Sequence, residues 1–127
     1  MREGTAMQLQ ESGQMYLETI YVLSKTINGV HSIDISEHMG YSKPSVSRAV
    51  NLLKSGGYIT IDEENHITLT ETGLEIAEKI YNRHIVLSKM LMALGVPEEI
   101  AAEDACRMEH TISDESFEAI RRHVERM

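Results

Sequence analysis

Two short helical patterns, a tight turn and two short β patterns follow one another without interruption over residues 32–70, and this order limits the fold more than any other feature. Residues 32–39 predict a short helix closed by a glycine, and Ser42 is typical of the N-cap of a next helix that runs to Gly56. Residues 58–70 place β-branched side chains on both sides of a polar four-residue turn, which predicts a hairpin. Helix, turn, helix and hairpin in this order predict a winged helix.

The remainder of the chain is predicted to be helical, because apolar side chains recur at helical spacing. The predicted helices cover residues 15–23, with an end near Asn28-Gly29, then 71–94, 98–110 and 115–127, the last behind the capping pair Ser113-Asp114. A chain of 127 residues does not suffice for two large independent cores. We therefore expect a mainly α protein with one small β-hairpin: a winged helix-turn-helix domain over residues 1–72, followed by a helical domain over residues 73–127.

Charge is distributed unevenly along the chain. The formal net charge of −8 argues by itself against DNA as a partner, because DNA phosphates are bound by Lys and Arg. Residues 38–61, however, contain no Asp or Glu, and they include three basic side chains on the predicted second helix of the winged helix. Hydroxyl and basic groups on an exposed helix face can bond phosphates and base edges. The predicted DNA-contacting residues are Ser42, Lys43, Pro44, Ser45, Ser47, Arg48 and Lys54; an ordinary solvated helix face is the alternative.

Several function classes lack support in the sequence. The single cysteine, Cys106, excludes an internal disulfide framework and suits a reducing cytosol, and neither a leader peptide nor a membrane span is recognisable. A zinc-protease motif, a glycine-rich phosphate loop and a nucleophile elbow are also missing from the sequence. We therefore expect a cytoplasmic protein that is not an enzyme, with no membrane partner and no small-molecule substrate.

Three side chains near the end of the predicted 98–110 helix have the chemistry of a metal site. Cys106, Glu109 and His110 are three and four residues apart, so a helix places them on one face. Thiolate, carboxylate and imidazole together form a ligand set for first-row transition metals. A buried cysteine beside an exposed Glu-His pair is the alternative. Two further segments carry donor groups: Met15 and Glu18 share a face of the first helix, and His84 lies midway along the long 71–94 helix.

These residues resemble the diphtheria-toxin-repressor family of metal-dependent bacterial repressors, including its smaller manganese-transport-regulator branch. The similar strings are Met15-Tyr-Leu-Glu18-Thr-Ile-Tyr21, Ser45-Val-Ser-Arg48, Leu69-Thr-Glu-Thr-Gly73, Arg83-His84 and Cys106-Arg-Met-Glu109-His110, with Asp114 after the last. The resemblance implies a repressor of metal-homeostasis genes that binds double-stranded operator DNA as a homodimer when loaded with divalent metal. It also implies that residues 73–127 bind metal and dimerise, in a short form without the C-terminal β-barrel of longer members.

The resemblance further implies a set of metal ligands. Met15, Cys106, Glu109 and His110 match the regulatory site of iron-type members, Glu18 and His84 match ligands of manganese-type members, and His84 also matches a ligand of the second iron-type site.

The match to each branch is incomplete. Iron-type members carry a carboxylate where this chain has Ser88 and a histidine where it has Ala102, whereas manganese-type members carry acids in place of Met15 and Cys106. Because sulfur ligands are soft and Mn²⁺ favours oxygen, we expect Fe²⁺ to be preferred over Mn²⁺, with Co²⁺, Ni²⁺ or Zn²⁺ able to substitute in vitro. A winged-helix regulator that does not respond to metal is the alternative function.

Overall fold

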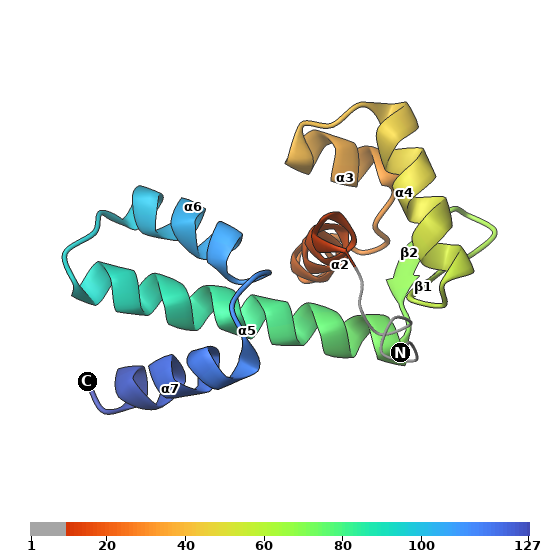
Figure 1. Ribbon diagram of the computed structural model, residues 1–127. Coiled ribbons are helices and arrows are strands. Elements are labelled where there is room, and N and C mark those ends of the chain that lie inside the picture. The colour runs from red at the N-terminus through yellow and green to blue at the C-terminus, as the bar shows by residue number, and fades with distance from the viewer. Residues whose placement is uncertain (1–9) are drawn as a thin grey trace. The chain divides into compact units, whose positions relative to one another are not determined.

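The computed structural model describes residues 10–127, which divide into two compact units, one up to Glu78 and one over Lys79–Met127. The first unit contains three helices, a hairpin and the start of a fourth helix (Figure 1). These elements are α2 (Glu11–Ser24), α3 (Ser32–Met39), α4 (Lys43–Ser55), β1 (Ile59–Ile61), β2 (Ile67–Leu69) and α5 (Glu71–Ala93), which continues into the second unit. The second unit adds α6 (Glu98–Met108) and α7 (Asp114–Glu125).

The helix-turn-helix pair α3 and α4 is defined by local signals at its ends. The backbone N–H of His31 donates to the Asp34 carboxylate over 2.8 Å, which caps the start of α3. Gly40 ends α3 with φ 75°, a left-handed conformation that favours glycine. Ser42 then caps α4, because its hydroxyl accepts the backbone N–H of Ser45 over 3.3 Å. Both predicted boundaries of this turn are confirmed.

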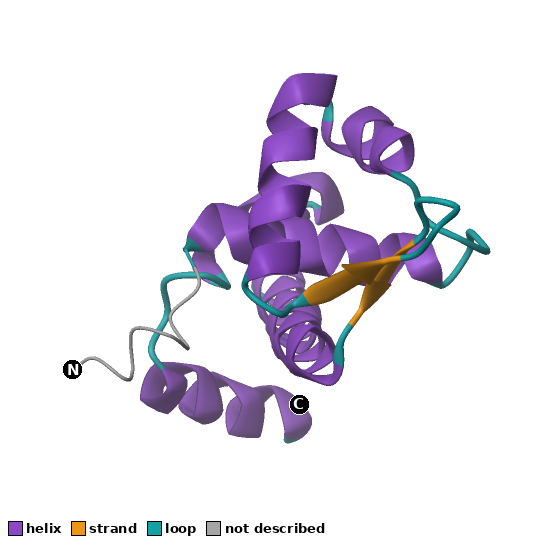
Figure 2. Cartoon of the chain, turned by 90° about the vertical axis from the view of Figure 1, so that its right-hand side faces the viewer, coloured by secondary structure: helices purple, strands orange, loops and turns teal. Residues whose placement is uncertain are grey.

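The hairpin follows α4 directly, and its two strands are antiparallel (Figure 2). Thr60 pairs with Thr68 at the centre, and both side chains are exposed, whereas Ile59 and Ile67 are buried. This alternation is the period of two that a half-buried strand requires. A further bridge joins Ile67 to Val30, and it attaches the hairpin to the segment before α3.

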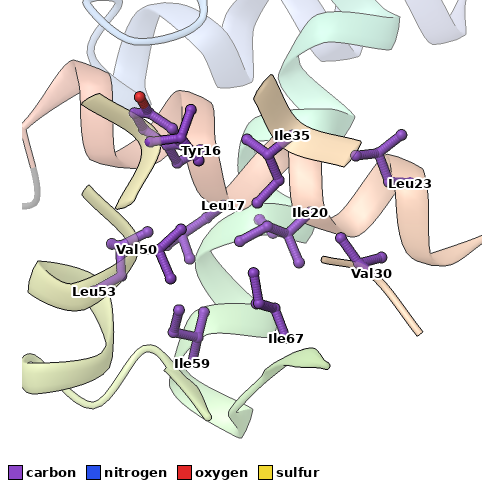
Figure 3. Packing of buried hydrophobic residues seen from close by; sticks show 12 residues of the cluster. Tyr16, Leu17, Ile20, Leu23, Val30, Ile35, Val50, Leu53, Ile59 and Ile67 are labelled. Atoms are coloured by element: carbon purple, nitrogen blue, oxygen red, sulfur yellow. The ribbon is translucent and has the colours of Figure 1, made fainter. Parts of the chain in front are cut away.

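A single apolar core holds the first unit together, with contributions from every one of its elements. In Figure 3 the labelled side chains of α2, α3, α4 and both strands converge on one another. Leu17, Ile20 and Ile35 have no exposed surface. The predicted inward face of α4 is confirmed, because its buried residues are Val46, Val50 and Leu53.

The second unit has its own smaller core, which joins its three helices. Leu87 of α5, Ala105 of α6 and Phe117 of α7 are buried together. The hydroxyl of Ser113 accepts the backbone N–H of Ser116 over 3.1 Å, so the predicted cap of the last helix is confirmed.

The predicted fold class is confirmed, but several helix ends differ from the predicted ones: α7 covers Asp114–Glu125 rather than residues 115–127, and α5 ends at Ala93 rather than at residue 94. α2 begins at Glu11 and ends at Ser24, rather than covering residues 15–23 and stopping near Asn28-Gly29. α6 ends at Met108 rather than at His110, but Glu109 keeps right-handed helical backbone angles and donates its backbone N–H to the Ala105 carbonyl over 2.9 Å, so it continues the last helical turn. Among the described residues, no helix combines the length and apolar character needed to cross a membrane.

Candidate metal centre and nucleic-acid interface

A fully buried carboxylate lies between two imidazoles in the second unit. Oε1 of Glu109 lies 2.9 Å from Nδ1 of His84 on α5, and the Glu109 side chain has no exposed surface. The other oxygen, Oε2, lies 3.3 Å from Nε2 of His110, a side chain that is only 2% exposed. An ionised carboxylate only accepts hydrogen bonds, so Nδ1 of His84 is the donor. Burial of a carboxylate is costly without partners, and the hydrogen bond from His84 offsets part of that cost here.

The thiol of Cys106 belongs to the same group. Its Sγ, a carboxylate oxygen of Glu109 and a ring nitrogen of His110 all lie within 4.8 Å of one another. A half-exposed cysteine, a buried carboxylate and two imidazoles provide sulfur, oxygen and nitrogen donors, which fit a divalent first-row transition metal. These residues would hold the ion in the second unit. We call His84, Cys106, Glu109 and His110 the second-unit donor cluster.

Arg83 fixes the turn that presents Glu109 and His110. Its buried guanidinium donates to the backbone carbonyls of Glu109, over 3.1 Å, and Ile112, over 2.8 Å. It also pairs with the carboxylate of Asp114 at the start of α7. The carbonyl of Glu109 is thus held by a side chain of α5, at the point where α6 stops being helical. Arg83 was not a predicted site residue, although it directly precedes His84. Its bonds reach residues far along the chain, and no local sequence signal indicates such a role.

Two basic side chains of α5 contact the carboxylate of Asp114. Lys79 lies 3.3 Å from the same carboxylate oxygen that Arg83 contacts. The hydrogen bond and charge of Lys79, followed by the charge of Arg83, hold the pKa of Asp114 below its ordinary value. Asp114 therefore remains ionised and keeps the start of α7 attached to α5 next to the donor cluster.

Two of the predicted ligands belong to the first unit. Met15 and Glu18 lie three residues apart on α2, so they share one face of that helix, and both are half-buried. The other four predicted ligands come together in the second unit. The six predicted ligands are therefore divided between the two units.

The predicted DNA-contacting face lies on α4, and most of it is exposed. Lys43, Pro44, Ser47, Arg48 and Lys54 are exposed, as is the capping residue Ser42, whereas Ser45 is half-buried. The Ser42 hydroxyl also donates to that of Ser45 over 3.0 Å. The hydrogen bonds of these two serines therefore stabilise the start of α4.

Sequence reasoning missed one polar residue on this face. Asn51 is exposed and lies one turn after Ser47 and Arg48, so helical spacing alone would have found it. It lines a groove of about 360 Å³ together with Ser47 of α4, Asn65 of the hairpin turn and residues near the start of α3. An asparagine amide can bond adenine bidentately, which makes Asn51 a candidate base-reading group.

Family models match both parts of the chain. The model of the iron dependent repressor N-terminal DNA binding domain matches residues 8–67. The model of the iron dependent repressor metal binding and dimerisation domain matches residues 70–127. The two matches agree with the winged-helix unit and the donor-bearing unit described above, and they confirm the resemblance in sequence motifs.

Curated relatives and solved structures agree with the family models. The transcriptional regulator MntR of Escherichia coli O157:H7 is 32% identical over 106 residues, which cover 84% of this chain and 68% of that protein. The iron-dependent repressor IdeR of Mycobacterium tuberculosis is 32% identical over 111 residues, which cover 85% of this chain and 47% of that protein. The structure of the manganese regulator SloR matches with a TM-score of 0.80 and 29% identity, over 89% of this chain and 53% of that one.

The chain thus spans about half the length of IdeR and SloR and about two thirds of MntR. A winged helix, a buried donor cluster and relatives that are transcriptional regulators all lead to one assignment. The chain belongs to the iron-dependent repressor family of metal-dependent transcriptional repressors.

Proposed function

We propose that this chain represses metal-homeostasis genes by binding operator DNA as a homodimer when it holds a divalent metal, with Fe²⁺ favoured over Mn²⁺. The supporting observation is the Glu109 carboxylate, which is fully buried and flanked by two imidazoles. A carboxylate with such neighbours, with a thiol one turn earlier, is an arrangement suited to a cation. No catalytic step belongs to this proposal, and its site of action is the cytoplasm, where DNA is accessible.

The proposal assigns a role to each part of the chain. Residues 1–72 bind DNA through α4 and the hairpin, and residues 73–127 bind metal and dimerise. Met15 and Glu18 are ligands from the first unit that act with the second-unit donor cluster. A bound divalent cation would supply the positive charge that these donor groups bind. The metal must bind more tightly to the DNA-binding state of the protein than to the other state, because a bound ion shifts an equilibrium only by its differential affinity for the two states.

The preference for Fe²⁺ rests on ligand chemistry. Identity to relatives does not decide it, since MntR and IdeR are both 32% identical to this chain. Met15 and Cys106 offer a thioether and a thiolate, which are softer than the carboxylate and water ligands that suit Mn²⁺. A site with two sulfur ligands therefore discriminates against Mn²⁺.

DNA affinity with and without metal tests the proposal. A duplex is first selected from a random library with Fe²⁺-loaded protein under anaerobic conditions, and its affinity is then measured by fluorescence anisotropy with excess chelator or with Fe²⁺. We expect Fe²⁺ to raise the affinity by about 5- to 150-fold, the usual range of coupling between two sites. Sedimentation of the loaded protein with the duplex is expected to give two chains per site.

A matched pair of variants serves as the control. Glu109→Gln removes the buried charge and is expected to abolish the effect of Fe²⁺, whereas Glu98→Gln, on an exposed position of α6, is expected to retain it. Equal DNA affinity of the wild type in chelator and in Fe²⁺ would overturn the proposal in favour of a metal-independent winged-helix regulator.

A further inference from the structure

A second group of donor side chains lies in the first unit, at the turn of the hairpin. Nδ1 of His66 lies 3.2 Å from Oδ2 of Asp62 and 3.7 Å from Oε1 of Glu64. One ligand atom from each of these three residues lies within 4.8 Å of the other two. We call Asp62, Glu64 and His66 the wing cluster. None of them belongs to the predicted metal ligands or to the predicted DNA-contacting face.

The backbone of the turn fixes the Asp62 carboxylate. Its Oδ1 accepts two backbone N–H groups, from Glu64 over 2.8 Å and from His66 over 2.9 Å. The turn closes with Asn65 at φ 66°, a left-handed conformation, and the backbone N–H of Asn65 donates to the carbonyl of Asp62 over 3.0 Å. With Oδ1 occupied by the main chain, Oδ2 is the oxygen that faces the imidazole.

The His66 ring is held from two further sides. Gly29 has φ 91°, and a Cβ at this position would lie 2.7 Å from Nε2 of His66, so the ring occupies space that only a glycine leaves open. The ring of His31 packs edge-on, with 4.7 Å between the ring centroids and an interplanar angle of 70°. Nε2 of His31 in turn donates to the carbonyl of Glu64 over 3.2 Å. The imidazole and the turn are therefore positioned together before any ligand arrives.

We propose that the wing cluster binds a divalent transition-metal ion through Asp62 Oδ2, Glu64 Oε1 and His66 Nδ1. Oxygen and nitrogen ligands at about 2.1 Å from a metal are roughly 3–3.5 Å from one another. The hydrogen bond between His66 Nδ1 and Asp62 Oδ2 already holds these two atoms 3.2 Å apart, and Glu64 Oε1, at 3.7 Å from Nδ1, needs to move only slightly closer. An imidazole with two carboxylates suits Zn²⁺ and Co²⁺. Metal binding transfers the Nδ1 proton to solvent or to Nε2, since the ligating nitrogen must be unprotonated.

Charge at the turn favours the same ligand. Asp62, Glu63 and Glu64 are consecutive acids, and all three are exposed. A divalent cation would neutralise most of this local negative charge. This site is independent of the second-unit donor cluster, because all of its ligands come from five consecutive residues of the hairpin.

The experiment uses the full chain without DNA and Co²⁺ as the probe. Co²⁺ is paramagnetic, so it broadens or shifts the amide NMR signals of residues near each bound ion. We expect one class of signals in the second unit and a separate class at Gly29, Asn65 and Thr68 in the hairpin region. Zn²⁺ in excess is expected to displace Co²⁺ from both classes.

Two adjacent substitutions provide the matched comparison. Glu64→Gln and Glu63→Gln remove the same charge from exposed neighbouring positions, but only Glu64 belongs to the wing cluster. We expect Glu64→Gln to weaken Co²⁺ binding at the hairpin by at least about tenfold, and Glu63→Gln to leave it within about twofold. His66→Gln is expected to abolish it, while His38→Gln, on an exposed position of α3, is expected to have no effect.

Two results would overturn the inference. One is the absence of Co²⁺-dependent changes at Gly29 and Asn65. The other is an equal loss in Glu63→Gln and Glu64→Gln, which would indicate diffuse attraction of counterions to an acidic turn. Neither result bears on the proposed function, because the hairpin signals and the metal-dependent DNA affinity are read out separately.

Discussion

Arg83 is the residue on which the geometry of the second-unit donor cluster depends most directly. It holds the backbone carbonyls of Glu109 and Ile112 and the carboxylate of Asp114. Lysine keeps the charge but lacks the planar fork of donors. We expect Arg83→Lys to lower the free energy of unfolding by about 1–3 kcal/mol and to weaken Co²⁺ binding in the second unit by about tenfold. Urea denaturation followed by circular dichroism and a Co²⁺ titration measure the two effects.

Arg107→Lys is the matched control for Arg83→Lys. The Arg107 side chain is 75% exposed and pairs with Asp104 on the surface of α6. Surface ion pairs contribute little, so we expect a change of at most about 0.5 kcal/mol and unchanged Co²⁺ affinity. If the two variants behave alike, Arg83 has no positioning role.

At the scale of the element, α4 combines a buried apolar face with an exposed polar and basic face. Arg48 can pair bidentately with guanine, whereas Lys43 is at the helix start, where a phosphate contact is expected. Arg48→Ala is therefore expected to cost about 1–3 kcal/mol on the selected duplex and to relax its sequence preference. Lys43→Ala is expected to weaken all duplexes alike and to reduce the salt slope by about one unit. Anisotropy titrations on selected and scrambled duplexes at several salt concentrations measure both.

Lys89→Ala is the control for α4, because it removes the same charge from an exposed position of α5 in the second unit. We expect it to bind both duplexes like the wild type. Wild-type binding by the Arg48 and Lys43 variants would mean that α4 does not contact DNA.

At the scale of the whole molecule, the proposed metal preference depends on one sulfur ligand from each unit. The double variant Met15→Asp with Cys106→Glu replaces both with hard oxygen donors, so its response to Mn²⁺ is expected to rise relative to Fe²⁺. The measurement is DNA affinity with each metal in turn. Co²⁺-loaded wild type is also expected to show a near-ultraviolet sulfur–cobalt charge-transfer band that Cys106→Ser lacks.

Two measurements would contradict the proposed preference for Fe²⁺ over Mn²⁺. A wild type that responds best to Mn²⁺ and has no sulfur–cobalt band would show that Cys106 is not a ligand. In that case the argument from soft ligands is wrong, whereas the proposed metal-dependent repression is unaffected, because the DNA assay in chelator tests it independently.

The winged helix could be predicted from the sequence because its signals are local. The glycine that ends α3, the serine cap of α4 and the alternating strand residues each act within a few positions of where they lie. The grouping of Cys106, Glu109 and His110 could also be predicted, since three- and four-residue spacing brings side chains together in helical geometry and Glu109 keeps that geometry just after α6.

Only the tertiary structure decided how those donors are held. The contact between His84 and Glu109 joins positions 25 residues apart, and the bond from Arg83 to the Glu109 carbonyl spans 26. That bond holds the carbonyl where α6 ends at Met108, a boundary that periodicity had placed at His110. Helical periodicity reports which side chains share a face of one helix, and it carries no information about which residue of another helix will bond to the backbone. The identity of the ligands is thus a property of the sequence, and the burial and orientation of Glu109 are properties of the packed helices.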